Sequence, residues 1–244
     1  MYPGPLITTE GLILTLDASS PRSYPGSGTA WNNLGDDLYD ATIEGSPSFE
    51  SENGISYLDF DSTGTKHAVL NNVFEVESLS IEFYVQPATN PGGSSSDTGR
   101  ILSRDRSDYW MVGRAYPGYS VPNALEWTIR PGGTSMKKHY TSTAFFTDGE
   151  WVHGIVTYNG SDGVRNVYQN GTLFETITNA GSTSGNIGNG ATRVIAVNNN
   201  VESAGAQNNL GFKGYYALIR AYSIPLTAKQ VKQNYNAVKN RFGL

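Results

Sequence analysis

Hydrophobic and polar residues alternate along many short stretches of this chain, with the two-residue period of β-strands that bury one face. In residues 79–87, LSIEFYVQP, the side chains of Leu79, Ile81, Phe83 and Val85 would line one side of such a strand. The predicted strands are residues 12–18, 56–60, 79–87, 100–104, 108–115, 124–131, 151–159, 164–177, 192–197 and 214–224. About ten to fourteen short antiparallel strands predict an all-β domain, a jelly-roll sandwich of two sheets.

One tight turn can be located from the sequence alone. Residues 164–177 contain QNGTLFE, in which Asn170 and Gly171 supply the two residues with positive φ that a type I′ turn requires. Apolar pairs stand on both sides of this dipeptide, at 167–168 and 173–174. The segment therefore predicts a β-hairpin.

The end of the chain predicts one helix, over about residues 227–242. Thr227 is a favourable N-cap and Gln230 stands three residues later, as in a capping box, while Leu226 and Val231 can form a hydrophobic staple. One apolar stripe at helical spacing consists of Val231, Tyr235, Val238 and Phe242. We therefore expect this helix to dock on the sandwich through the stripe.

Two lysines of the same helix do not suit its ends. Lys229 and Lys232 lie in the first turns, where the helix dipole disfavours positive charge, whereas Lys239 and Arg241 lie at the favourable C-terminal end. We predict that Lys229 and Lys232 face solvent or an acidic surface of a partner protein.

Composition favours one large β-domain and excludes other classes. The 244 residues include 28 glycines, 38% are hydrophobic and only 16% are charged, and no segment has the character of a linker, so we expect a single domain over residues 1–244. The absence of cysteine excludes disulfides and thiolate chemistry. No apolar stretch approaches the roughly 20 residues that span a bilayer, and the start of the chain does not resemble a signal peptide. We expect a soluble protein made in the cytosol, without membrane contact.

Charge is distributed unevenly along the chain. Residues 1–122 carry 16 acidic and 6 basic side chains, whereas residues 123–244 carry 6 acidic and 11 basic ones. Distant segments meet in a sandwich, so we expect these charges to mix within the domain; contacts between copies or with a partner are the alternative. The net charge of −5 and the shortness of the basic run at 136–140, MKKHY, argue against a nucleic-acid partner.

Candidate catalytic and metal-binding groups are sparse. A retaining glucanase needs two carboxylates about 5 Å apart, and the nearest pairs, at positions 75 and 77 and at 59 and 61, lack the alternating motif of that class. His153 follows Trp151 in a predicted strand and fits a core or cross-strand hydrogen bond better than a general base. An acidic loop could offer oxygen ligands to calcium through Asp36, Asp37, Asp40 and Glu44. Its spacing lacks the regular calcium-loop pattern, so we expect no cofactor, with bound calcium as the less favoured alternative. Because the catalytic carboxylate motif is also missing, we expect no enzymatic activity.

Residues 108–123 hold the best candidates for glycan binding, since aromatic rings beside polar and charged groups are typical of such sites. Tyr116 and Tyr119 lie on either side of a Pro-Gly turn, and Trp110 and Arg114 precede them on a predicted strand. Alternation predicts that one of Tyr109 and Trp110 faces the core. Ordinary packing under a long loop is the alternative.

The segment EWVHGIVTYNGSDGVRNVYQNGTLFET resembles the central hairpin of laminin-G-like domains in the concanavalin A-like lectin/glucanase superfamily. The matching positions are Trp151, His153, Thr157, Tyr158, Tyr168, Asn170 and Gly171. Residues 11–34 and 214–244 resemble the segments that accompany this domain in structural proteins of tailed bacteriophages, notably those of cyanobacteria. Relatives often carry acidic residues where this chain has Tyr216 and Ala217, so a calcium site is further in doubt.

This resemblance implies a non-enzymatic virion structural protein, a capsid decoration or tail-associated appendage, made in the host cytoplasm and localised to the virion. Its partners would be other virion proteins, host surface polysaccharide bound weakly by its loops, and further copies of itself in a closed homo-oligomer. A carbohydrate-binding lectin or adhesin for host glycans is the first alternative. A glycoside hydrolase relative without the catalytic carboxylate motif is the second.

Overall fold

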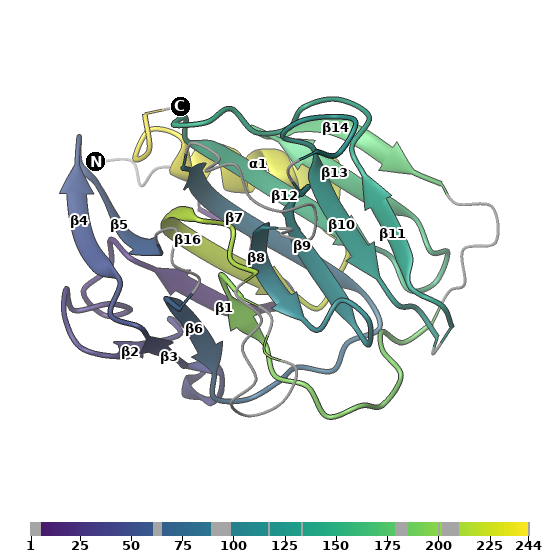
Figure 1. The fold of residues 1–244 in the computed structure, drawn as a ribbon, viewed down its shortest axis with the longest axis horizontal. Helices are drawn as coiled ribbons and strands as arrows, with labels where there is room; N and C mark the ends of the chain where they lie inside the picture. The colour runs from purple at the N-terminus through teal and green to yellow at the C-terminus, as the bar shows by residue number, and fades with distance from the viewer. Residues whose placement is uncertain are drawn as a thin grey trace.

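The computed structural model, which describes residues 6–60, 65–88, 99–116, 118–132, 134–178, 185–199, 201 and 210–243, confirms an all-β sandwich with a short C-terminal helix (Figure 1). The first sheet has the strand order β14-β13-β12-β7-β16-β5-β4, with β1 also paired to β16. The second sheet has the order β11-β10-β9-β8-β15-β6-β3-β2. All strand pairs in both sheets are antiparallel, as expected for a jelly roll.

The strands of the first sheet are β1 (Leu12–Asp17), β4 (Ser48–Glu52), β5 (Ile55–Phe60), β7 (Leu79–Pro87), β12 (Val152–Tyr158), β13 (Arg165–Gln169), β14 (Thr172–Ile177) and β16 (Gly214–Tyr222). Those of the second sheet are β2 (Ala30–Trp31), β3 (Ala41–Glu44), β6 (His67–Leu70), β8 (Gly99–Arg104), β9 (Trp110–Arg114), β10 (Leu125–Ile129), β11 (Lys137–Tyr140) and β15 (Ala196–Val197). The helical elements are η1 (Asp37–Tyr39) and α1 (Ala228–Val238).

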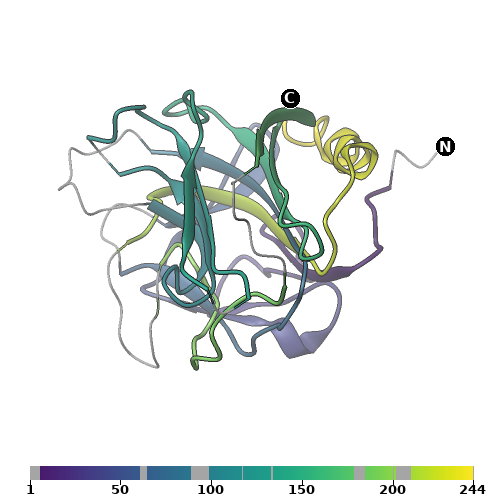
Figure 2. The ribbon, with the colours of Figure 1, turned by 90° about the vertical axis from the view of Figure 1, so that its right-hand side faces the viewer.

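Strand β7 crosses the centre of the first sheet and is buried on both faces. Its predicted apolar side enters the core between the sheets through Leu79, Ile81, Phe83 and Val85. Its other side is also buried, because α1 lies across the outer face of the first sheet (Figure 2). Glu82 and Tyr84, which point to that side, are both fully buried.

Helix α1 begins where the sequence predicts and its regular part is shorter than predicted. Both bonds of the capping box are present: the Gln230 amide donates to the Thr227 hydroxyl at 3.3 Å, and the Thr227 amide donates to Gln230 Oε1 at 2.9 Å. The helix ends at Val238, and residues 239–243 form turns instead. These turns still bury Phe242, whose ring centroid lies 3.9 Å from that of Tyr84.

The predicted hairpin is confirmed between β13 and β14. Asn170 and Gly171 have φ values of 49° and 74°, the positive values of a type I′ turn. A Cβ atom on Gly171 would come within 2.7 Å of the Tyr235 ring, so the turn also packs closely against α1. The hairpin and the helix therefore stabilise one another's position.

Segments from the acidic and basic halves of the chain interleave, as expected for a sandwich. β1 pairs with β16, which brings residues 12–17 against residues 218–222. Ion pairs cross between the halves: Arg220 to Glu82 at 3.0 Å and Arg241 to Asp17 at 2.8 Å. Charges from the two halves of the chain thus meet within the domain.

Candidate binding site on the outer face of the second sheet

Two neighbouring strands place four polar or aromatic side chains on the outer face of the second sheet. The side chains of β10 that enter the core are Leu125, Trp127 and Ile129. Because strand residues alternate, Glu126 and Thr128 lie on the opposite face. The register of β11 sets Tyr140 opposite Glu126 and Lys138 opposite Thr128, so all four share that face.

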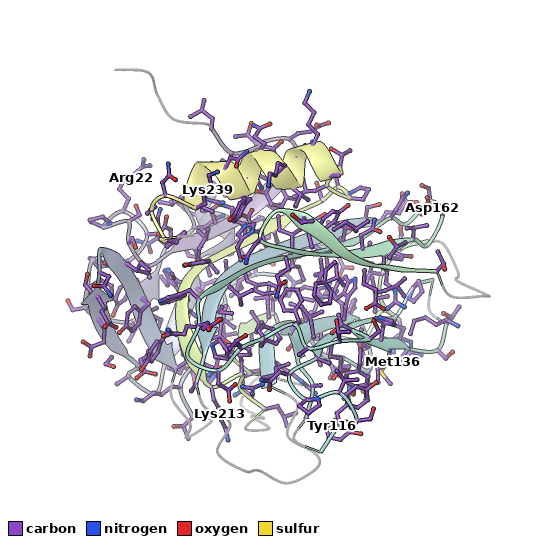
Figure 3. All side chains as sticks on the ribbon, turned by 90° about the horizontal axis from the view of Figure 1, so that it is seen from above. Arg22, Tyr116, Met136, Asp162, Lys213 and Lys239 are labelled. Atoms are coloured by element: carbon purple, nitrogen blue, oxygen red, sulfur yellow. The ribbon has the colours of Figure 1, made fainter. Side chains whose placement is uncertain are left out.

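Three tyrosines meet beside these residues and form what we call the tyrosine cluster: Tyr116, Tyr119 and Tyr140. The Tyr119 and Tyr140 ring centroids are 4.1 Å apart, and Tyr116 approaches them edge-on at 5.7 and 6.2 Å. Each ring is half-buried, so each keeps part of its surface open to solvent. Figure 3 shows Tyr116 on the side of the molecule opposite the helix. The cluster is an aromatic surface of the kind that can stack on an apolar ligand face.

A buried carboxylate and two cations adjoin the cluster. Glu126 is fully buried, and its Oε1 accepts a hydrogen bond from the Thr128 hydroxyl at 2.9 Å. The same oxygen lies 3.8 Å from an Arg106 guanidinium nitrogen and 3.9 Å from Lys138 Nζ. Lys138 Nζ also lies 4.9 Å above the Tyr140 ring, a cation–π contact. The face thus combines aromatic rings, hydrogen-bond donors and charge within a small area.

Burial and charge shift two pKa values at this site. Burial, and then the Glu126 carboxylate, raise the pKa of Tyr140 far above its usual value, so its hydroxyl stays protonated and can donate. Burial lowers the pKa of Lys138; Glu126 opposes this shift, while Arg106 and Arg100 add to it. Arg106 and Arg100 thus add positive potential at the Lys138 ammonium group.

The sequence-predicted glycan residues are only partly brought together. Tyr116 and Tyr119 lie in the tyrosine cluster as proposed. Trp110 does not, because its side chain is 1% exposed and stacks on Phe74 in the core with centroids 6.0 Å apart. Arg114 is also buried, and its guanidinium group forms an ion pair with Asp148 at 2.6 Å. Both residues are therefore structural and offer no surface for a glycan.

Sequence reasoning missed Tyr140, Lys138, Glu126 and Arg106. The run MKKHY at 136–140 was considered only as a basic patch, although Lys138 and Tyr140 stand two apart, the spacing of one strand face. β10 contains Glu126 between two core residues, which marks it as an outward-facing carboxylate. Only the correct register between β10 and β11 shows that these residues lie side by side on one face, and the sequence alone does not give that register.

The two lysines predicted to face solvent or a partner do face solvent. Lys229 and Lys232 are exposed on α1, and Lys232 Nζ lies 5.0 Å from the Tyr235 ring centroid. Lys229 borders an open hollow of about 550 Å³ between the start of the helix and the N-terminal segment, with Thr8 and Glu10 on its other side. The contact of these lysines with a partner stays a prediction.

Several of the other candidate groups make structural contacts. His153 Nε2 lies 2.9 Å from Glu82 in the core, as its strand position suggested. Asp36 and Asp40 accept bonds from the backbone amides of Leu38 and Asn33. Within the described ranges, no group of three or more His, Asp or Glu side chains is placed to hold a metal ion. Position 61, half of one candidate carboxylate pair, lies outside the described residues.

A second aromatic cluster lies on the outer face of the first sheet. Tyr57 and Tyr215 stack with centroids 4.6 Å apart, and Trp151 lies 5.6 Å from Tyr57. Burial, and then nearby acidic groups, raise the pKa of Tyr57 and Tyr215. This cluster is the competing location for an aromatic ligand platform, and it differs from the tyrosine cluster by its negative surroundings.

Comparison with known proteins identifies the family to which these features belong. The Laminin_G_3 family, described as the concanavalin A-like lectin/glucanases superfamily, matches residues 61–232. No curated protein matches the chain in sequence. No helix of the described chain is long and apolar enough to cross a membrane.

Solved structures share the fold at low sequence identity. Domain 4 of AbnA, an extracellular arabinanase from Geobacillus stearothermophilus, in complex with arabinotriose, matches with a TM-score of 0.64 and 16% identity, over 92% of this chain and 98% of that one. The binding domain of Paraclostridial Mosquitocidal Protein 1 matches with a TM-score of 0.66 and 13% identity, over 94% and 53%. A structure of botulinum neurotoxin type C, a toxin whose cell entry depends on interaction with two ganglioside molecules, has a TM-score of 0.61, 16% identity, and coverage of 93% and 51%. The chain thus spans about half the length of the two toxin chains. At this identity the likeness shows the fold.

Proposed function

The chain belongs to the concanavalin A-like lectin/glucanase superfamily, and on this premise we propose that it is a non-catalytic carbohydrate-binding domain whose site is the tyrosine cluster. The observation that carries the proposal is the packing of Tyr116, Tyr119 and Tyr140 at the surface, beside Lys138 and Arg106. Aromatic rings offer a flat apolar surface to the C–H face of a sugar, and the flanking charged groups can bind its oxygens.

The likeness to binding domains supports this proposal. Nearly all of this chain superposes on nearly all of the arabinanase domain that was solved with arabinotriose. The toxin structures that share the fold are described as binding or receptor-binding domains. A binding role of this chain, without chemistry of its own, would agree with each of these relatives.

The distribution of carboxylates supports the absence of catalysis. The strands of the second sheet carry two carboxylates on their outer face, Glu126 on β10 and Glu44 on β3. Five strand spacings separate β10 from β3 in the sheet order, which is about 24 Å at about 4.8 Å per strand. A glycosidase needs its two carboxyl groups about 5–9.5 Å apart. These strands therefore supply no hydrolytic pair.

Alanine substitution in the tyrosine cluster tests the proposed site. Tyr119→Ala and Tyr140→Ala are each expected to weaken binding of the best oligosaccharide from a glycan array by about tenfold, since truncation of a central aromatic contact typically costs more than 1 kcal/mol. The measurement is isothermal titration with each variant, after thermal melts confirm folding.

Tyr215→Ala is the matched control, because it removes a half-buried tyrosine from the aromatic cluster of the opposite sheet. It should leave binding unchanged. Loss of binding in Tyr215→Ala with retention in Tyr119→Ala would move the site to the first sheet. Binding of no glycan by the unmodified domain would reject the function itself.

Attachment to a phage particle is the second candidate function. It is supported by the resemblance of residues 11–34 and 214–244 to structural proteins of tailed bacteriophages, and by the exposure of Lys229 and Lys232 on α1. If these lysines meet an acidic partner surface, the double change Lys229→Glu and Lys232→Glu should reduce incorporation of the protein into particles. Unchanged incorporation together with unchanged folding would contradict this attachment surface.

A further inference from the structure

We propose that the saccharide bound by the tyrosine cluster is acidic, and that its carboxylate binds between Arg106 and Lys138. This inference rests on the proposed carbohydrate-binding function and specifies the class of ligand.

The charges at the site are arranged in depth, with the negative group below the positive ones. The Glu126 side chain is 0% exposed, whereas those of Arg106 and Lys138 are 27% and 35% exposed. A ligand that approaches the tyrosine cluster therefore meets two cations and does not meet the carboxylate. The exposed part of the site is positive, although the chain as a whole has a net charge of −5.

The donors of these two cations are largely unused. Within the described part of the chain, neither the Arg106 guanidinium nor the Lys138 ammonium group makes a hydrogen bond, and their distances to Glu126, 3.8 and 3.9 Å, are those of long ion pairs. Other arginines of the domain differ. Carboxylate partners at 2.6–3.0 Å engage Arg114, Arg220 and Arg241. Arg106 and Lys138 therefore retain N–H donors from which a carboxylate can accept hydrogen bonds.

Glu126 acts on the ligand through its neighbours and is a positioning residue. Its Oε1 is shared by the Thr128 hydroxyl, Arg106 and Lys138, which keeps the two cations on the same side of the sheet, next to Tyr140. The buried negative charge also limits the charge that the ligand can carry. Together with Arg106 and Lys138 it leaves the three groups with a net charge of +1, which a ligand group with one negative charge, such as a carboxylate, neutralises.

The sugar ring and its carboxylate then bind to different parts of the site. The ring lies against the tyrosine cluster, where Tyr119 and Tyr140 offer adjoining faces, and the carboxylate reaches the cations at the edge of Tyr140.

The test compares a panel of uronate-containing oligosaccharides with their carboxyl-reduced, neutral counterparts, titrated against the intact chain. We expect each bound acidic member to bind about tenfold more tightly than its neutral counterpart, a difference of about 1.4 kcal/mol. This preference should decrease as the salt concentration rises, because salt screens the exposed cations. Sulfated oligosaccharides of the same backbones form the third arm.

Variants locate the preference. Lys138→Met and Arg106→Gln should each weaken binding of the acidic member more than binding of its neutral counterpart, and so abolish most of the preference for the acidic member. Lys137→Met is the matched control: it changes the adjacent lysine of β11, which lies on the other side of the strand opposite Ile129, and should have no effect.

The outcomes separate this inference from the proposed function. Equal binding of acidic and neutral members, or an unchanged preference in Lys138→Met, would overturn the acidic specificity while the carbohydrate-binding function stands. Tighter binding of the sulfated arm would also overturn it. Binding of no member in any arm would reject both the specificity and the function.

Discussion

Replacing Glu82 by glutamine is expected to lower the free energy of unfolding by about 3–5 kcal/mol, since a buried charge left without its partner costs that much. Glu82 is fully buried between the first sheet and α1 and accepts four contacts. Oε1 receives Arg220 at 3.0 Å and His153 at 2.9 Å, while Oε2 receives Tyr222 at 3.1 Å and Asn234 at 2.8 Å. Glutamine would leave Arg220 without a counter-charge and turn an amide N–H₂ toward donors.

Urea unfolding at neutral pH measures this loss. Glu75→Gln is the control, because Glu75 also pairs with an arginine, Arg104, but is 65% exposed. It should change the stability by less than about 1 kcal/mol. A loss below about 1 kcal/mol in Glu82→Gln would show that the buried network does not hold the helix on the sheet.

The same network gives the stability a defined dependence on pH. Burial alone would raise the pKa of Glu82, but Arg220, His153 and Tyr222 outweigh burial and lower it to about 2. A carboxyl group with a lowered pKa stabilises the fold fully above its unfolded pKa of about 4.3 and loses that contribution as the pH falls toward 2. The unmodified domain should lose this part of its stability between about pH 4.5 and 2, and Glu82→Gln should not.

Replacing Phe242 by alanine is the second change with a large expected effect, about 3–5 kcal/mol for a buried aromatic side chain. Its ring is 2% exposed and stacks on Tyr84, and its carbonyl accepts a hydrogen bond from the Tyr84 hydroxyl at 2.8 Å. Both contacts secure the turns that follow α1. Without the ring, the cavity would lie between the end of the chain and the centre of the first sheet.

Arg241→Ala separates this packing from the neighbouring ion pair. Arg241 binds Asp17 but is 37% exposed, so its loss should cost only about 0–1 kcal/mol. Thermal and urea unfolding of both variants give the comparison. Equal losses in the two variants would show that the ion pair, and not the buried ring, anchors the end of the chain.

The sequence predicted those parts of the fold that depend on short-range patterns. The capping box at Thr227 and the turn at Asn170 and Gly171 follow from local chemistry, and both are confirmed. The strands β2, β3, β4, β6 and β11 were not predicted, because they are short and several carry charged or exposed residues. Their pairing is decided by neighbouring strands, which local patterns do not contain.

The candidate site depends even more on pairing. Tyr116 and Tyr119 were found because residues that flank a Pro-Gly turn are better candidates for exposure than residues within a strand. Tyr140 joins them only through the register of β10 with β11. Alternation predicts that only one of Tyr109 and Trp110 faces the core. In the structure the side chains of both are buried, so the placement of Trp110 in the site was wrong.

Asn234 of α1 is another residue whose role depends on contacts that local sequence patterns do not contain. It stands beside Tyr235 of the apolar stripe, and no local sequence pattern singles it out. In the structure it is fully buried, donates to Glu82 and Tyr222, and accepts from the amide of Thr8 at 2.8 Å. These three partners lie on different elements, so only the assembled fold shows that Asn234 joins the helix, the sheet and the N-terminal segment.

A structure of the domain with its tightest-binding oligosaccharide tests the central claim most directly. We predict that the sugar ring lies against Tyr119 and Tyr140 on the outer face of the second sheet, with Lys138 at its edge. A sugar bound instead at Tyr57, Trp151 and Tyr215 on the first sheet would contradict the assignment of the site.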